Sequence, residues 1–188
     1  MSESPGYLMP LPLLQPRTFD AVLGDLFDAP QRERQWQREG HPARRYIMGL
    51  PVPAWQRGLV WIEAQQQAFV ESAWLGLHLG MVVINGVRRD HGTGQVHPLS
   101  GLLLDGQQRL AAIDAYLRSH FPVCGHYWHE LPPHEQARFS RTPFTRCEVS
   151  LWHEGRLQDL YDRMNFGGTA HAPHERASTK TPDQASGA

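Results

Sequence analysis

The chain has 188 residues, 40% of them hydrophobic, and a formal net charge of −1 from 18 Lys and Arg against 19 Asp and Glu. This length fits one domain with a sizeable core and excludes a second large catalytic domain. The near-zero charge excludes strong bulk attraction to nucleic acid, so any binding of nucleic acid would need a local arginine patch.

Targeting and disulfide signals are absent from the sequence. The two cysteines, Cys124 and Cys147, do not make a disulfide framework, and residues 1–16 lack the basic-then-apolar order of a signal peptide. No apolar run approaches the roughly 20 residues that span a bilayer. We therefore expect a cytoplasmic protein without a membrane partner.

The first predicted element is a helix at about 19–28. Apolar residues recur at helical spacing between Phe19 and Phe27, Thr18 can cap them, and Pro30 can end them.

The next stretch, 31–45, is polar and arginine-rich around a lone Trp36. We favour an exposed loop or frayed helix here over the alternative, an arm that binds a nucleic-acid backbone. The arginines of that arm would be Arg32, Arg34, Arg38, Arg44 and Arg45.

The middle of the chain alternates strands and helices. Tyr46–Met48 is a predicted short strand, and residues 50–58, with two prolines and a glycine, are expected to be a fixed loop without regular structure. A helical pattern follows from Trp61 to Leu75. The β-branched run Met81–Ile84 then predicts a buried strand.

A long hairpin connection is expected over Asn85–Pro98, leading to an apolar run over Gly101–Asp105. Apolar periodicity predicts a helix from Gln108 to about His120, and a second, short helix at about 133–139 after an irregular stretch. Period-two alternation over Thr145–Trp152 predicts a half-exposed strand.

The last predicted helix is amphipathic and is stopped by a glycine pair. Its apolar residues run from Leu157 to Met164, and Gly167–Gly168 follow. Residues 176–188 carry no large apolar side chain, so a disordered tail is expected there.

The first polar motif, Asp105-Gly106-Gln107-Gln108-Arg109, lies between an apolar run and a helix pattern. The first N–H groups of a helix lack intrahelical partners and carry the positive end of its dipole, so an anion is favoured there. Arg109, one turn into the helix, could then fork onto phosphate oxygens. The alternative is a turn in which Asp105 only caps the helix.

The arrangement of the side chains favours a polar pocket. Successive helical residues point about 100° apart, so two amides and an arginine cannot all face solvent while the core side stays intact.

A second motif, Trp55-Gln56-Arg57, lies on the proline-braced loop and is followed by Trp61. A glutamine and an arginine held beside tryptophans suit recognition of anions and rings. The alternative places the tryptophans in the core and Arg57 on the surface, and for Trp61 the core interpretation is favoured.

A third motif ends the last predicted helix, where Arg163 and Asn165 precede Gly167-Gly168-Thr169. Asn and Gly are common at helix C-termini, so the motif can be a plain stop signal. Paired glycines also expose backbone donors that can approach a phosphate or base. The sequence leaves both interpretations open.

Taken in chain order, with the Gln56-Arg57 motif first, the Asp105–Arg109 motif second and the Arg163–Thr169 motif last, the three motifs resemble the DGQQR-motif domain at the N-terminus of the GmrS type of modification-dependent restriction enzyme, in the wider ParB/sulfiredoxin-like superfamily. The matching residues are Pro53, Gln56, Arg57, Gly58, Trp61, Asp105 to Leu110, Arg163, Asn165, Gly167, Gly168, Thr169 and Glu175. The chain departs from that pattern at Trp55, where many relatives have Tyr, and at Ala111-Ala112, where threonines are usual.

The resemblance implies an α+β fold, a compact ParB/sulfiredoxin-like domain with a small mixed sheet flanked by helices, over residues 46–175. The N-terminal helix and arginine-rich segment, 1–45, would precede it, and the tail, 176–188, would follow. In related defence proteins such a domain binds and hydrolyses a nucleoside triphosphate to control DNA cleavage, joined to a helical region and often to an HNH-type nuclease. A partner nuclease subunit is therefore expected.

The first hypothesis for function is a nucleotide-binding domain that also hydrolyses the nucleotide with Mg²⁺. Asp105 would hold Mg²⁺ through water or orient the attacking water, with Gln108 as the second catalytic residue. The nucleotide and its phosphates would be held by Gln56, Arg57, Gly106, Gln107, Arg109, Arg163, Asn165, Gly167 and Gly168.

Two alternatives remain. A binding module without turnover would use the same pocket and the arginine-rich segment to bind a DNA backbone, a modified base or a partner restriction protein. Direct nuclease or phosphoryl-transfer activity on DNA is the weakest alternative, because the charge is near neutral and the sequence has no clear metal cluster.

Overall fold

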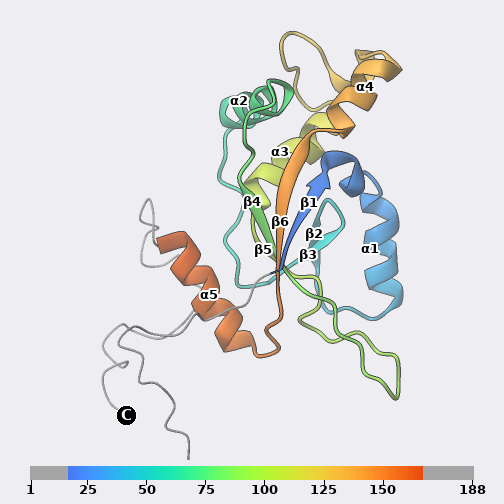
Figure 1. Ribbon diagram of the computed structural model, residues 1–188, viewed down its shortest axis with the longest axis vertical. Coiled ribbons are helices and arrows are strands. Elements are labelled where there is room, and N and C mark those ends of the chain that lie inside the picture. Colours follow the sequence, from blue (N-terminus) through green and yellow to red (C-terminus); the bar gives the residue numbers. More distant parts are fainter. Residues whose placement is uncertain (1–16, 167–188) are drawn as a thin grey trace, which may run out of the picture.

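The computed structural model describes residues 17–166, and the account below concerns these residues. Two sheets form the framework (Figure 1). The larger sheet has the strand order β1-β6-β4-β5, from Arg17–Val22, Pro143–Val149, Met81–Asn85 and Leu103–Asp105. The smaller is a hairpin of β2 (Arg45–Ile47) and β3 (Leu50–Val52).

The larger sheet is mixed, as expected. β1 and β5 pair antiparallel with their neighbours, whereas β4 and β6 run parallel. Five α-helices accompany the sheets within 17–166, namely α1 (Ala29–Arg38), α2 (Glu63–Trp74), α3 (Gln107–Leu117), α4 (Pro133–Ser140) and α5 (Glu154–Phe166). This arrangement confirms the compact α+β class.

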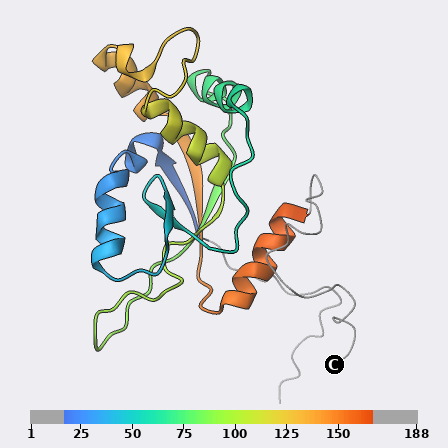
Figure 2. The ribbon, with the colours of Figure 1, turned by 180° about the vertical axis from the view of Figure 1, so that it is seen from behind.

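Alternation along the strands divides the apolar side chains between two cores. Val82 and Ile84 of β4 face the main core, which α2 and α3 cover, whereas Val83 between them faces a second core. Leu157 and Leu160 of α5 close that second core. In both views α5 lies apart from the other helices (Figure 1 and Figure 2).

The predicted helix at 19–28 is wrong. Residues Arg17–Val22 form β1, paired antiparallel with β6, and only Leu23–Leu26 form a short 3₁₀ helix. The apolar residues do recur at helical spacing, but the hydrogen bonds to β6 decide the backbone conformation. As a result Phe19 is exposed. Pro30 opens α1 instead of ending a helix, since proline suits the first turn.

The polar stretch after Pro30 is more ordered than expected. Its first part is a regular helix, α1, and Trp36 is 8% exposed because its ring packs against Gly101. The interpretation as an exposed loop or frayed helix is therefore wrong for 31–38. Leu23, Leu26 and Ala29, which come just before this stretch, belong to the main core, so the chain that leads into α1 packs with the rest of the domain.

The proline-containing segment after Gly49 also holds a strand that the sequence did not predict. Met48 and Gly49 have φ angles of 50° and 72°, which suits a two-residue hairpin turn, and β3 returns beside β2. Pro51 is tolerated because the ribbon has only two strands, so proline removes no central ladder bond.

Most other predicted elements are confirmed with small shifts in their ends. These are β2, α2, β4, β5, α3, α4, β6 and α5. A bridge between Arg89 and Val96 confirms a hairpin-like connection after β4. The predicted tail and the Gly167-Gly168 loop lie outside the described residues. Within 17–166, none of the helices has the length and apolar character needed to cross a membrane.

Candidate functional site

The junction between β5 and α3 turns sharply at Gly106. This residue has a φ of 99°, and a Cβ built on it would lie 3.1 Å from Cγ2 of Val82, so a side chain there would be both strained and crowded. The turn aims the start of α3 away from the end of β5. The first N–H groups of α3, from Gln107 onward, have no partner within the helix.

A cavity of about 150 Å³ lies at this helix start. We call it the α3 cavity. Three segments that are distant in sequence line it, with Gln56, Arg57 and Trp61 from one loop, Leu104 to Arg109 from the β5–α3 junction, and Tyr161 and Asn165 from α5. The fold thus brings Gln56, Arg57, Asp105 and Asn165 together around one space.

The two glutamines of the junction bind the loop that carries Arg57. Oε1 of Gln108 accepts from the N–H groups of Val60 (3.0 Å) and Trp61 (3.2 Å), and its Nε2 donates to the carbonyl of Gly58 (3.0 Å). Nε2 of Gln107 donates to the carbonyl of Arg57 at 3.0 Å. Both ends of the Gln108 amide are therefore used inside the chain, which leaves it a positioning task.

Two further residues fix the same loop from other sides. Nε2 of Gln56, which is 5% exposed, donates to the carbonyls of Leu103 (3.0 Å) and Leu104 (2.8 Å) in β5. Arg45 donates through Nη2 to the carbonyl of Arg57 (3.2 Å) and to Oε1 of Gln107 (3.3 Å). These bonds hold the backbone at Arg57 against the start of α3.

The side chain of Arg109 binds the backbone at the start of β4 and acts as a clamp between β4 and α3. Its Nη1 donates to the carbonyl of Leu79 and its Nη2 to the carbonyl of Met81, both at 2.9 Å, and Nη2 also contacts Oδ2 of Asp105 at 2.7 Å. Gly80 makes room for the guanidinium, because a Cβ there would collide with Nη1. The guanidinium that the sequence suggests for phosphate is thus held by protein acceptors.

Tyr161 is a member of the cavity that sequence reasoning missed. It was assigned only to the apolar side of the last helix, yet it lines the cavity together with Asn165, whose Nδ2 donates to the Tyr161 carbonyl at 2.8 Å. The i, i+4 spacing of the two could have indicated a shared face. Burial raises the pKa of the Tyr161 hydroxyl, which the nearby Arg57 opposes and Asp162 and Asp105 reinforce.

Other predicted members of the site are placed differently. Arg163 is exposed on α5 and does not line the cavity, while Gly167 and Gly168 lie outside the described residues. Trp61 packs against the main core, as the favoured interpretation expects, and also lines the cavity.

The proposed arginine arm is divided by the fold. Arg32 donates to the carbonyls of Met48 (3.0 Å) and Asp25 (2.6 Å), and burial lowers its pKa. Arg45 is bound inward as described above, whereas Arg34, Arg38 and Arg44 are exposed. Three of the five arginines are therefore exposed as the arm requires.

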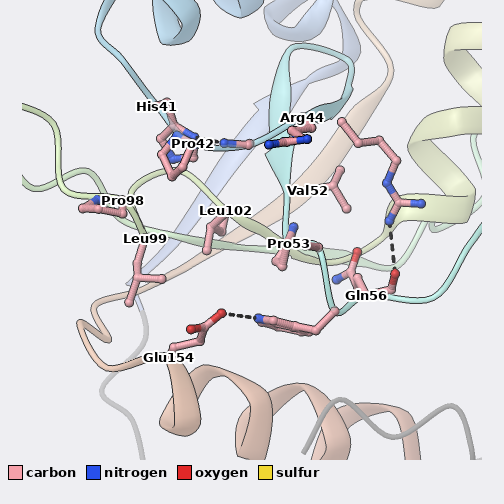
Figure 3. A pocket seen from close by; sticks show the side chains of 14 residues that line it. His41, Pro42, Arg44, Val52, Pro53, Gln56, Pro98, Leu99, Leu102 and Glu154 are labelled. Atoms are coloured by element: carbon pink, nitrogen blue, oxygen red, sulfur yellow. Dashed lines mark hydrogen bonds between the residues drawn. The ribbon is translucent and has the colours of Figure 1, made fainter.

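A second, larger cavity of about 560 Å³ adjoins the α3 cavity, and Gln56 lines both. We call it the Trp55 cavity. Val52 and Pro53 approach it from one side, Pro98, Leu99 and Leu102 from the other, with His41 and Arg44 above and Glu154 of α5 below (Figure 3). Oε1 of Glu154 accepts a bond from Nε1 of Trp55 at 3.1 Å.

His41 gives this region a predicted pH dependence. Burial lowers the pKa of His41, although its bond to the Ser100 carbonyl (2.9 Å) opposes the shift. The unfolded chain then binds a proton near pH 6.5 that the folded chain does not, so stability is full above about pH 6.5 and falls as the pH drops below it. The carboxylates Glu39 and Asp90 have lowered pKa values, so their contribution to stability is lost only at a lower pH than that of His41.

We expect His41→Gln to reduce the loss of melting temperature between about pH 7.5 and about pH 5.5, because the side chain that takes up the proton is gone. Thermal melts at the two pH values measure this, and His91→Gln, at an exposed position, is the matched control. An unchanged pH dependence in His41→Gln contradicts the assignment.

Comparison with known proteins gives one family. A family model described as GmrSD restriction endonuclease, N-terminal domain, matches residues 41–146. This match contains both the Gln56-Arg57 and the Asp105–Arg109 segments and ends before α5. No curated protein and no solved structure matches the chain.

Proposed function

Because the chain belongs to the family of GmrSD restriction endonuclease N-terminal domains, which links it to DNA restriction, we propose that it binds a nucleoside triphosphate with the phosphates at the N-terminus of α3. One observation carries the proposal. Arg57, Asp105 and Asn165, from three separate segments, meet around the start of this helix.

The chemistry of the α3 cavity suits phosphate groups. Helix N-termini bind anions through unpartnered N–H groups and the positive end of the dipole, and the turn at Gly106 presents those groups. The half-buried Arg57 adds a full positive charge at the same cavity. The volume of about 150 Å³ equals roughly five water molecules at about 30 Å³ each, which is enough for phosphate groups.

The hypothesis of nucleotide hydrolysis includes Mg²⁺, and the residues present fit this ion. Asp105 is the one carboxylate among the described residues that line the α3 cavity, and Mg²⁺ bound with a nucleotide commonly takes one or two protein carboxylates besides phosphate oxygens and water. Bound there, Mg²⁺ would neutralise charge on the phosphates. Arg109 holds Oδ2 of Asp105, so Oδ1 is the oxygen that would face the ion or orient an attacking water.

Positioning is the role we assign to the remaining polar residues of the motif. Gln107, Gln108 and Arg109 keep the Arg57 loop and the start of β4 fixed to α3. Fixed donors cost no reorganisation when a charged ligand arrives, which is the advantage of a prebuilt anion site. A DNA-binding role has less support, because Arg32 and Arg45 of the arm are bound inward.

Replacing Arg57 with alanine is expected to raise the Kd of the nucleotide about tenfold or more, since a charge-assisted contact contributes about 1.5 to 3 kcal/mol. Titration calorimetry with ATP, GTP, CTP and UTP, each with Mg²⁺, measures the loss. Arg141→Ala, at an exposed arginine that follows α4, is the matched control and should leave the Kd unchanged. If the wild-type chain binds none of the four nucleotides, the proposed function is wrong.

A further inference from the structure

A nucleoside triphosphate is too large for the α3 cavity. Its volume of about 150 Å³ accommodates phosphate groups, so the base and ribose of the same ligand have to lie elsewhere. The adjoining Trp55 cavity measures about 560 Å³, within the range of about 300–1,000 Å³ typical of sites for small organic ligands. Gln56, which is 5% exposed, lines both cavities, so the larger space begins on the other side of one side chain from the phosphate end.

The walls of the Trp55 cavity suit a flat ring. Val52, Pro53, Leu99 and Leu102 present apolar surface on two opposite sides (Figure 3). An aromatic ligand gains stability from burial and from stacking on an aromatic side chain, and such stacking contributes about 1–3 kcal/mol for a base.

Trp55 lines the larger cavity and is held there by two contacts. Its indole nitrogen is bonded to Glu154 at 3.1 Å, and its ring packs edge-on to Tyr161 with centroids 5.3 Å apart. Tyr161 in turn lines the α3 cavity. The contact between the two rings therefore joins the wall of the larger cavity to the wall of the phosphate end.

Polar groups of both signs stand around the apolar walls. Arg44 is exposed and Glu154 adds a carboxylate acceptor, so the polar edge of a ring and the hydroxyls of a sugar can be paired. We infer that the Trp55 cavity binds the base and ribose of the nucleotide whose phosphates occupy the α3 cavity. This inference rests on the proposed function and adds to it the site of the base.

The test fills the Trp55 cavity and leaves the α3 cavity intact. Ala43→Trp and Leu99→Trp place an indole in it from two different loops, and Leu77→Trp, exposed after α2, is the matched control. The 188-residue chain and each variant are titrated calorimetrically, in Mg²⁺, with ATP, GTP, CTP, UTP and inorganic tripolyphosphate. Tripolyphosphate is the probe for the phosphate end alone.

The wild-type chain should bind at least one nucleotide about tenfold more tightly than tripolyphosphate, because the base adds a stacking contact. Both filled variants should raise the Kd of that nucleotide by about tenfold and leave the Kd of tripolyphosphate within about twofold. Leu77→Trp should change neither of these two Kd values. Two filled variants are used so that the test still stands if one of them does not fold.

The inference is overturned if tripolyphosphate binds as tightly as every nucleotide, since the proposed phosphate site then survives without a base site. It is equally overturned if both filled variants keep full affinity for the nucleotide. The same holds if both lose affinity for tripolyphosphate as strongly as they lose affinity for the nucleotide. A short DNA duplex is titrated in parallel, and the inference is also overturned if both filled variants lose affinity for the duplex but keep it for the nucleotides, since the cavity then binds an extruded DNA base. Failure of the wild-type chain to bind either probe overturns the proposed function itself.

Discussion

Replacing Arg109 with leucine is expected to lower the free energy of unfolding by about 2 to 4 kcal/mol, which for a chain of this size corresponds to a fall of roughly 5 to 15 °C in melting temperature. The variant removes the donors for the Leu79 and Met81 carbonyls and the partner of Asp105 together. The Arg109 side chain is 20% exposed, so its bonds to the two carbonyls are screened less than those of a surface arginine, whereas solvent weakens the ion pair with Asp105, whose side chain is 38% exposed. Thermal and urea unfolding measure the change.

Arg118, which caps the C-terminal end of the same helix, provides a matched control. It also pairs with an aspartate four residues before it, Asp114, at 2.9 Å, but its side chain is 59% exposed. Because exposed i, i+4 pairs contribute only about 0.3–0.5 kcal/mol, Arg118→Leu should melt close to the wild-type temperature. Equal melting temperatures for the Arg109 and Arg118 variants would contradict the role of Arg109 as a clamp.

The second large effect concerns turnover. If Asp105 orients the attacking water or holds Mg²⁺, Asp105→Asn should reduce the rate of nucleotide hydrolysis about a hundredfold or more, as expected for loss of a general base or metal ligand. Asparagine keeps the size of the side chain and an oxygen for Arg109, so the clamp is retained. Release of inorganic phosphate under single-turnover conditions is the measurement.

Binding must be measured beside turnover. The Asp105→Asn chain should bind the nucleotide in the absence of Mg²⁺ with a Kd no weaker than that of the wild type, because a negative charge next to the phosphates has been removed. Asp159→Asn, at an exposed position of α5, is the control that should leave both quantities unchanged. Hydrolysis at the wild-type rate in Asp105→Asn would remove Asp105 from the mechanism.

The sequence predicted the junction between β5 and α3 well because the signal there is local. An apolar run, an Asp-Gly pair and a helix pattern follow each other within a few residues, and these alone determine that Gly106 turns the chain into α3. Arg57 and Asn165 were assigned to the site from their residue types alone. The structure places both of them in the lining of the cavity beside this turn.

The tasks of the glutamines could not be predicted in the same way. Gln107 and Gln108 bond to residues about fifty positions earlier in the chain, and no local pattern encodes those partners. Arg109 looked suitable for phosphate by type, whereas its acceptors are backbone carbonyls that only the folded chain places beside it. Polar residue types indicate that a polar site exists, but the tertiary partners decide which of them stay available for a ligand.

The errors at the N-terminal end have the same cause. Phe19 lies in a helix-like pattern, but its backbone is held by a strand more than one hundred residues away, and pairing with that strand decides its conformation. Pro30 and Pro51 were both taken as breaks, although one opens α1 and the other lies in a two-stranded ribbon.

The central claim is that the backbone at the start of α3 receives the phosphates, and titration of the ¹⁵N-labelled chain with tripolyphosphate followed by amide resonances tests it most directly. Backbone donors cannot be removed by mutation, but their resonances report the contact. The account predicts that the largest shifts fall on Gly106, Gln107, Gln108 and the Arg57 loop. Shifts concentrated instead on α1 and Arg44, with the α3 amides unmoved, would contradict it.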